Sequence, residues 1–306
     1  MSAFSNGGAR SRPASLRMAA VQMRFAPDLR GNLARITKAL HAAVARRADV
    51  VLFPECALTG YHCDFAALQR DELQVALAQV AALAAFHRIN ILIGTPMFSG
   101  RVLRNCLAVF DRQGQLTYVY AKCQLTELDR RVFAPGDAIA LFEIDGIPAT
   151  AIICHERRYP ELVRLAVMAG ARILFHPNAG LDALPVSRRK RGGRDGIAVR
   201  AFENAIPYVF ANSVGPQGGG KWSAGDSKIV AADGRCLRLA DNQREMVIVA
   251  DVDLCSATGK YALESLESPR FLRSSWRQMV ALVKRQAKQE SARARSILPN
   301  LTPLQA

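Results

Sequence analysis

Short apolar stretches alternate with amphipathic segments along the first third of the chain. Residues 16–23 and 49–53 are apolar runs of strand length, and between them apolar side chains repeat at helical spacing over residues 29–44. The same helical spacing returns over residues 73–83, and a further apolar strand follows at 91–94. This pattern predicts the element order β-α-β-α-β.

Hairpin signals replace the helical spacing in the middle of the chain. Strand-like residues 105–110 and 116–120 flank a polar turn that ends at Gly114, and strand-like residues 140–144 and 149–153 are joined through Asp145-Gly146. We therefore expect antiparallel pairing in this region.

The alternation of helices and strands resumes at Pro160, a residue type that favours the first position of a helix. We expect this helix to direct Leu162, Leu165 and Ala166 inward and to stop at Gly170. The remaining predicted elements are strands at 173–175 and 208–211, a helix at 196–204, and strands at 228–232 and 246–252 flanking a turn at Asp233-Gly234. Strand-rich stretches between outer helices predict a layered α/β fold in which two sheets pack together.

Composition divides the chain into three segments. Residues 1–15 form a Gly/Ser-rich leader that we expect to be disordered, and residues 16–265 show no break that would separate two domains. Residues 266–306 read as a basic helix and tail, with an apolar stripe formed by Leu272, Trp276, Met279 and Val283. We expect this stripe to dock on the protein's own core or on a partner subunit rather than on a membrane.

The net charge of +15 lies mainly in peripheral segments: the leader, residues 188–194 and the C-terminal tail. Because no basic groove with interleaved aromatic residues accompanies it, we do not expect a nucleic-acid site. A non-catalytic basic protein whose tails bind an acidic partner remains the alternative of a different class. Retention on a polyanion that persists in Cys154→Ala would support that alternative.

The hydrophobic stretches are too short for a membrane helix, and the leader lacks the apolar segment of a secretory signal. Seven scattered cysteines do not form the pattern of a disulfide framework. We therefore expect a cytoplasmic protein with reduced thiols that does not bind a membrane.

Cys154 lies where an apolar strand ends and a helix begins shortly afterwards. Because helix N-termini and neighbouring cations lower the pKa of a thiol, this placement favours a reactive thiolate, although a lone cysteine is more often a buried structural residue. Glu55, in Phe53-Pro54-Glu55, and Lys122, in Tyr120-Ala121-Lys122, also follow apolar strands. Strand ends collect ligand sites in layered α/β folds, so the three groups are candidates for one pocket.

The order Glu, Lys, Cys in these contexts resembles the nitrilase superfamily of carbon–nitrogen hydrolases. The resemblance rests on F-P-E, Y-x-K and I-C-H-E-R-R-Y-P-E, and it extends to Phe133–Asp137, Arg200–Asn204 and Gly225–Ser227, covering about residues 16–254. It implies a four-layer α-β-β-α sandwich, a dimer or larger homo-oligomer, and chemistry without a cofactor.

The resemblance implies that Glu55 is the general base, Lys122 the electrostatic stabiliser and Cys154 the nucleophile that forms a thioester. The backbone amide of His155 can join Lys122 in stabilising the oxyanion. The family places a second glutamate where this chain has Asp129, one methylene shorter. Asp129 and the neighbouring Glu127 both remain candidates for that role.

The residues that follow Cys154 bear on the class of substrate. The sequence Cys-His-Glu departs from the Cys-Trp-Glu of true nitrilases, which favours a small amide over a nitrile. Arg157 and Arg158 resemble the arginines of N-carbamoyl amino acid hydrolases, so a carbamoyl substrate stays open and the pair is a candidate for binding a substrate carboxylate. Internal salt bridges are the structural alternative for the two arginines.

Two residues that follow an apolar strand, His176 and Asn178, are candidates for lining the pocket. His62-Cys63 and His176 lack the spacing of metal ligands, so no metal site is expected.

Overall fold

A computed structural model of the chain describes residues 13–61, 64–189, 197–265 and 273–297. The chain divides into two compact units, residues 1–262 and residues 263–306. The predicted leader lies almost entirely outside the described residues, as do His62 and Cys63.

The first sheet contains six strands in the order β15-β1-β2-β3-β4-β5. Strands β1, β2 and β3 are parallel, as expected for strands joined through helices, whereas β4, β5 and β15 join antiparallel. The bounds are β1 Ser15–Gln22, β2 Val50–Leu52, β3 Asn90–Ser99, β4 Val102–Phe110, β5 Leu116–Ala121 and β15 Met246–Asp253.

The second sheet has the order β14-β13-β10-β8-β7-β6, with β7, β8 and β10 parallel. A third, three-stranded sheet has the order β11-β12-β9, and its strands fall between β8 and β13 in the sequence. The bounds are β6 Phe142–Ile144, β7 Ile147–Ala151, β8 Leu174–Asn178, β9 Asp182–Ala183, β10 Tyr208–Asn212, β11 Val214–Pro216, β12 Lys221–Ala224, β13 Lys228–Val230 and β14 Cys236–Leu239.

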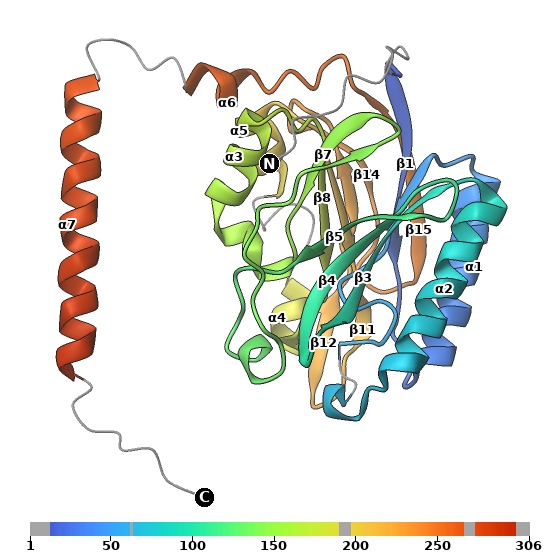
Figure 1. The fold of residues 1–306 in the computed structure, drawn as a ribbon. Helices are drawn as coiled ribbons and strands as arrows, with labels where there is room; N and C mark the ends of the chain where they lie inside the picture. Colours follow the sequence, from blue (N-terminus) through green and yellow to red (C-terminus); the bar gives the residue numbers. More distant parts are fainter. Residues whose placement is uncertain (1–12, 62–63, 190–196, 266–272, 298–306) are drawn as a thin grey trace, which may run out of the picture. The chain divides into compact units, whose positions relative to one another are not determined.

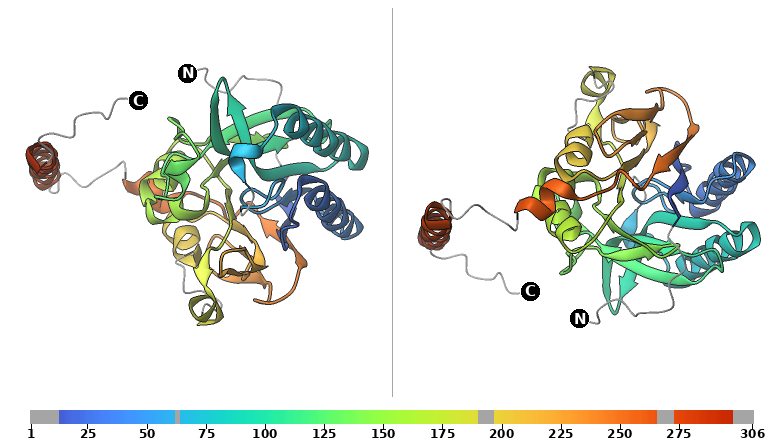
Figure 2. Two further views of the ribbon diagram at one scale, coloured as in Figure 1. Left: turned by 90° about the horizontal axis from the view of Figure 1, so that it is seen from below. Right: turned by 90° about the horizontal axis from the view of Figure 1, so that it is seen from above.

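Helices cover the outer face of each sheet, and the two inner faces pack on each other (Figures 1 and 2). Successive residues of β1 show why: Met18 and Ala20 join the core between the sheets, whereas Ala19 and Val21 join the core under α1 and α2. A third core packs α3 and α5 on the second sheet. This confirms the predicted four-layer α-β-β-α sandwich. The bounds are α1 Leu29–Ala45, α2 Arg70–His87, α3 Pro160–Met168, α4 Leu184–Arg189, α5 Ile197–Asn204 and α6 Lys260–Glu264, with 3₁₀ turns η1 Phe65–Ala67, η2 Asp129–Arg131 and η3 Cys154–Arg158.

Two local predictions were wrong. Leu165 does not point inward: it is 50% exposed, because α3 buries the face that carries Val163, Ala166 and Val167. Residues 246–253 do not flank the Asp233-Gly234 turn either. They pair with β1 in the first sheet, and the turn instead joins β13 to β14, a mostly exposed edge strand without apolar alternation.

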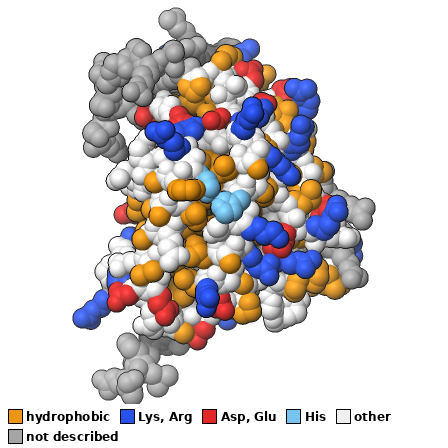
Figure 3. Space-filling view, turned by 90° about the vertical axis from the view of Figure 1, so that its right-hand side faces the viewer, with side chains coloured by type: hydrophobic (Ala, Val, Ile, Leu, Met, Phe, Trp, Pro, Cys, Tyr) orange, Lys and Arg blue, Asp and Glu red, His pale blue; other side chains and the backbone are white. Residues whose placement is uncertain are grey.

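The second unit contains α7, Arg273–Ile297, with Trp276 and Met279 more than half exposed. Within the described residues, no helix is both long and apolar enough to span a membrane. Docking of the apolar stripe stays a prediction, and its Leu272 lies outside the described residues. Figure 3 shows one face of the molecule, on which Lys and Arg side chains are scattered among apolar and neutral ones rather than aligned in a groove.

Candidate active site

Glu55 follows β2 and is fully buried, so its carboxylate needs partners for its charge and for its oxygen atoms. Oε1 accepts hydrogen bonds from Lys122 Nζ at 2.8 Å and from Asn105 Nδ2 at 2.7 Å. Oε2 accepts one from the Ala179 N–H at 3.0 Å, and the charge of the carboxylate acts on the Cys154 thiol, whose sulfur lies 4.0 Å from the Ala179 carbonyl oxygen. One buried carboxylate therefore links strand ends from both sheets.

Lys122 directly follows β5 and lies between two carboxylates. Its Nζ is 2.8 Å from Glu55 Oε1 and 2.9 Å from Asp129 Oδ2, and its side chain is only 1% exposed. Burial acts to lower the pKa of Lys122, but the negative charges of Glu55 and Asp129 outweigh it and raise the pKa well above the ordinary value. The ammonium is therefore charged at neutral pH.

Asp129, at the start of η2, is the carboxylate that reaches Lys122, whereas Glu127 is exposed. The Tyr61 hydroxyl donates to Asp129 Oδ1, and the Thr126 N–H donates to Oδ2 at 2.9 Å. Burial opposes ionisation, yet Lys122 and the Tyr61 hydroxyl lower the pKa of Asp129 below its usual value. Asp129 is thus held as a carboxylate.

Cys154 follows β7 and opens η3 with a backbone φ of 51°, in the left-handed region that non-glycine residues rarely adopt. The expected low pKa is wrong for this structure. Burial and the charge of Glu55 raise the pKa of the thiol to about 12, against the opposing charges of Lys122 and Arg157. The five-residue 3₁₀ turn does not offset the burial and the carboxylate, so the resting group is a neutral thiol near a base.

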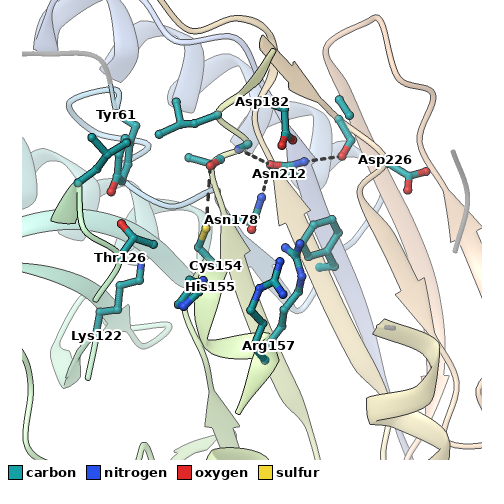
Figure 4. A pocket seen from close by; sticks show the side chains of 18 residues that line it. Tyr61, Lys122, Thr126, Cys154, His155, Arg157, Asn178, Asp182, Asn212 and Asp226 are labelled. Carbon is teal, nitrogen blue, oxygen red and sulfur yellow. Dashed lines mark hydrogen bonds between the residues drawn. The ribbon is translucent and has the colours of Figure 1, made fainter. Parts of the chain in front are cut away.

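Figure 4 shows the cavity above this thiol, with a volume of about 330 Å³. Its wall includes Lys122 and Cys154, and of the residues predicted to bind substrate, His155, Arg157, Arg158 and Asn178 also line it. The lining also includes Asn212 at the end of β10 in the second sheet, Asp182 on β9 of the three-stranded sheet, and Asp226 in the loop before β13. This is where the carboxyl ends of parallel strands are expected to form a site.

The two arginines make no ion pair with another described residue, which argues against internal salt bridges as their role. Arg157 is half-buried and Arg158 exposed. Asn178 donates from Nδ2 to Asn212 Oδ1 at 2.8 Å, but its own buried Oδ1 lacks a hydrogen-bond partner among the described residues. Considering the described residues alone, the cavity wall therefore offers two arginines without an ion pair and a buried Asn178 oxygen without a hydrogen-bond partner.

His176 was predicted to line the pocket, but the structure places it elsewhere. It is fully buried within β8 and contacts the Cys154 backbone from below, with Nε2 3.1 Å from the carbonyl oxygen. Residues 176 and 178 lie on the same face of β8, because side chains alternate along a strand. Only Asn178 is at the end of the strand, where the cavity lies, so His176 stays buried beneath it.

Three residues that surround the site were not singled out from the sequence. Asn105 and Tyr61 hold Glu55 and Asp129, respectively. Glu156 accepts hydrogen bonds from the Cys123, Gln124 and Ile153 N–H groups and from the Tyr120 hydroxyl, so it ties the Lys122 segment to the Cys154 turn. Its place two residues after the nucleophile was the available signal. Within the described part of the chain, no cluster of His, Cys, Asp and Glu has an arrangement that would hold a metal ion.

The profile of the carbon–nitrogen hydrolase family matches residues 17–260, which include every residue of this site. The chain belongs to this family. It shares the fold of nitrilase-superfamily members: a double mutant of the amidase from Nesterenkonia sp. AN1, solved in complex with acrylamide, superimposes with a TM-score of 0.72 over 88% of this chain and 100% of that one, at 23% sequence identity.

Curated relatives align over most of the chain. A probable nitrilase of Schizosaccharomyces pombe is 29% identical over 75% of this chain and 85% of its own length. The 2-oxoglutaramate amidase of Bacillus subtilis is 28% identical over 69% of this chain and 80% of its own length. Carbon–nitrogen hydrolysis is thus the shared chemistry of the family, while the names of the relatives differ in substrate.

Proposed function

We propose that this protein is a thiol amidase that cleaves the carbon–nitrogen bond of a small amide through a thioester on Cys154. One observation carries the proposal: the buried Glu55 carboxylate accepts hydrogen bonds from the Lys122 ammonium and the Ala179 N–H, and the Cys154 sulfur lies against the Ala179 carbonyl oxygen, where the charge of Glu55 acts on it. A base, a nucleophile and a cation are therefore within reach of one carbonyl group.

The first half-reaction follows from these contacts. As sulfur attacks the carbonyl carbon, the thiol proton passes to Glu55, and the oxyanion is stabilised by Lys122 Nζ and the His155 N–H. Collapse of the tetrahedral intermediate breaks the carbon–nitrogen bond, and Glu55 returns the proton to the departing ammonia or amine. A thioester remains.

Water completes the cycle. Glu55 accepts a proton from water as the oxygen attacks the thioester carbonyl, and collapse of the second tetrahedral intermediate expels the Cys154 sulfur. Sulfur regains a proton and the carboxylic acid leaves. In this scheme Asp129 keeps Lys122 charged and in place.

Two findings on similar proteins support the proposal. One relative is a 2-oxoglutaramate amidase, and a variant of the Nesterenkonia amidase was solved with the acetamide moiety of fluoroacetamide added covalently at its active-site cysteine. Hydrolysis of nitriles or of N-carbamoyl amino acids is the alternative within the same chemistry.

A substrate panel tests the proposal. Small amides, N-carbamoyl amino acids and nitriles are incubated with the protein, and released ammonia is measured, together with carbon dioxide for the carbamoyl compounds. Amides should be hydrolysed, Cys154→Ala should be inactive, and mass spectrometry of quenched reactions should show an acyl adduct on the Cys154 peptide. Ammonia release by Cys154→Ala would refute the mechanism.

We further propose that Arg157, supported by Arg158, binds a carboxylate of the substrate. A charge-assisted hydrogen bond contributes about 1.5–3 kcal/mol, so neutralising both arginines to Gln should lower kcat/KM on an acidic amide by about 10- to 100-fold. The rate on a neutral amide of similar size should change little. Arg101→Gln, an exposed arginine on the hairpin between β3 and β4, is the matched control. Equal losses on acidic and neutral amides would contradict the assignment.

A further inference from the structure

His176 makes two hydrogen bonds beneath the nucleophile. Its Nε2 lies 3.1 Å from the Cys154 carbonyl oxygen, and its Nδ1 lies 2.5 Å from the hydroxyl of Tyr208 on the neighbouring strand β10. Both side chains are fully buried. The mechanism above uses neither residue.

These partners fix the state of the imidazole ring. A carbonyl oxygen only accepts hydrogen bonds, so Nε2 must carry the proton and donate it, and Nδ1 must accept from the Tyr208 hydroxyl. Burial, reinforced by the positive charge of Arg157, holds the pKa of His176 well below its ordinary value. The ring is therefore neutral, in one tautomer, with each nitrogen paired.

The bond to the Cys154 carbonyl has a consequence on the opposite side of the peptide unit. A trans peptide is planar, so the Cys154 C=O and the His155 N–H point in opposite directions. Fixing the carbonyl oxygen toward the buried ring turns the N–H away from it. That N–H lies in the first turn of η3, where backbone donors have no acceptor within the helix, and no backbone acceptor for it is found in the described part of the chain.

The peptide needs such a restraint because Cys154 has a positive φ. A non-glycine residue in the left-handed region is strained and persists only where its surroundings hold it. The hydrogen bond from His176 is a restraint that acts directly on this peptide.

We propose that His176, with its tautomer set by Tyr208, is a positioning residue for the oxyanion site: it holds the Cys154–His155 peptide so that the His155 N–H faces the developing oxyanion. The inference rests on the proposed function. It assigns His176 a role in the acylation step rather than in substrate binding.

Paired variants test this role. His176→Phe keeps an aromatic ring but removes the donor, whereas His176→Gln keeps an N–H at similar reach. Because losing an oxyanion donor costs about 10²–10³ in rate, a misplaced one in His176→Phe should lower kcat by at least about tenfold with KM little changed. His176→Gln should recover most of kcat.

Alkylation by iodoacetamide separates positioning from general damage. Displacement of iodide by the Cys154 sulfur forms no oxyanion, so its rate, measured on the Cys154 peptide by mass spectrometry, should stay near wild type in both variants. Parallel loss of hydrolysis and alkylation in His176→Phe would overturn the proposal in favour of a structural role. Unchanged kcat in His176→Phe would overturn it as well.

Tyr208→Phe completes the experiment. Without the hydroxyl, Nδ1 can hold the proton and leave Nε2 with a lone pair facing the carbonyl, so kcat should fall less than in His176→Phe. The double variant should be no slower than His176→Phe alone, because both changes act on one hydrogen bond. Additive losses would contradict the coupling. Activity retained by Cys154→Ala would instead refute the proposed function itself, so the two failures are distinguishable.

Discussion

At the scale of single residues, the charge balance around the thiol decides its protonation state. Two carboxylates, Glu55 and Asp129, face one ammonium, Lys122, so the buried group carries a net negative charge before any substrate arrives. A thiolate would add a second negative charge in a poorly solvated place, and the pKa of Cys154 is accordingly raised. Proton transfer to Glu55 during attack avoids that cost, because total charge is unchanged.

Glu55→Gln should therefore separate two properties of Cys154. Loss of the general base should lower amide hydrolysis by about 10²–10⁴-fold. Loss of the negative charge should also lower the pKa of the thiol, which increases the thiolate fraction at neutral pH and speeds alkylation by iodoacetamide. The rate is measured on the Cys154 peptide, because Cys236 and Cys255 are exposed and also react. Slower alkylation together with lost hydrolysis would contradict this account.

The sequence identified Glu55, Lys122 and Cys154 as candidates, and the structure brings them together. The pKa of Cys154 could not be predicted, because its direction depends on the distance to a carboxylate 99 positions earlier in the chain. Only the structure distinguishes Asp129 from Glu127 as the second carboxylate of the site, because the two residues are just two positions apart in the sequence. The contacts of Tyr61 and Asn105 have no local signature at all.

At the scale of elements, the side chains of the site lie at strand ends, and close packing between backbone segments fixes the positions of those ends. Gly94 on β3 lies directly against the segment that carries Glu55: a Cβ at this position would lie 2.3 Å from the Pro54 carbonyl oxygen and 2.6 Å from Glu55 Cα. These are backbone atoms and cannot move aside as a flexible side chain could. The strand therefore requires glycine here.

Gly94→Ala should displace the Glu55 segment, lowering kcat and the free energy of unfolding, the latter by about 1–3 kcal/mol as for overpacking in a core. Gly146→Ala is the control: it lies in a turn with no atom within 4 Å of the added Cβ, so activity should be kept despite the strain of its φ of 77°. Urea unfolding and amide hydrolysis measure the two effects. A fully active, equally stable Gly94→Ala would show that the backbone shifts without cost.

Most elements were predicted because their apolar periodicity is strong. The exceptions have physical reasons: β14 is a largely exposed edge strand without alternation, and the partner of β15 is β1, more than 220 residues away in sequence. Periodicity indicates that a segment is a strand but does not indicate which sheet it joins.

At the scale of the whole molecule, all residues of the cavity belong to the first unit. A chain ending at Ser265 should therefore keep the kcat/KM of the full chain on amides and the midpoint of thermal unfolding. Loss of either would show that residues 266–306 contribute to the site or to stability. Size-exclusion chromatography of both forms tests whether the expected homo-oligomer depends on that segment.

The site is divided between the two sheets: Glu55, Asn105 and Lys122 come from the first, whereas Cys154 and Ala179 come from the second. Neither sheet alone holds a competent nucleophile and base. Recovery of catalytic activity during refolding consequently reports the packing of the two sheets on each other. Activity can return only after the core between the sheets has formed, even if the individual strands form earlier.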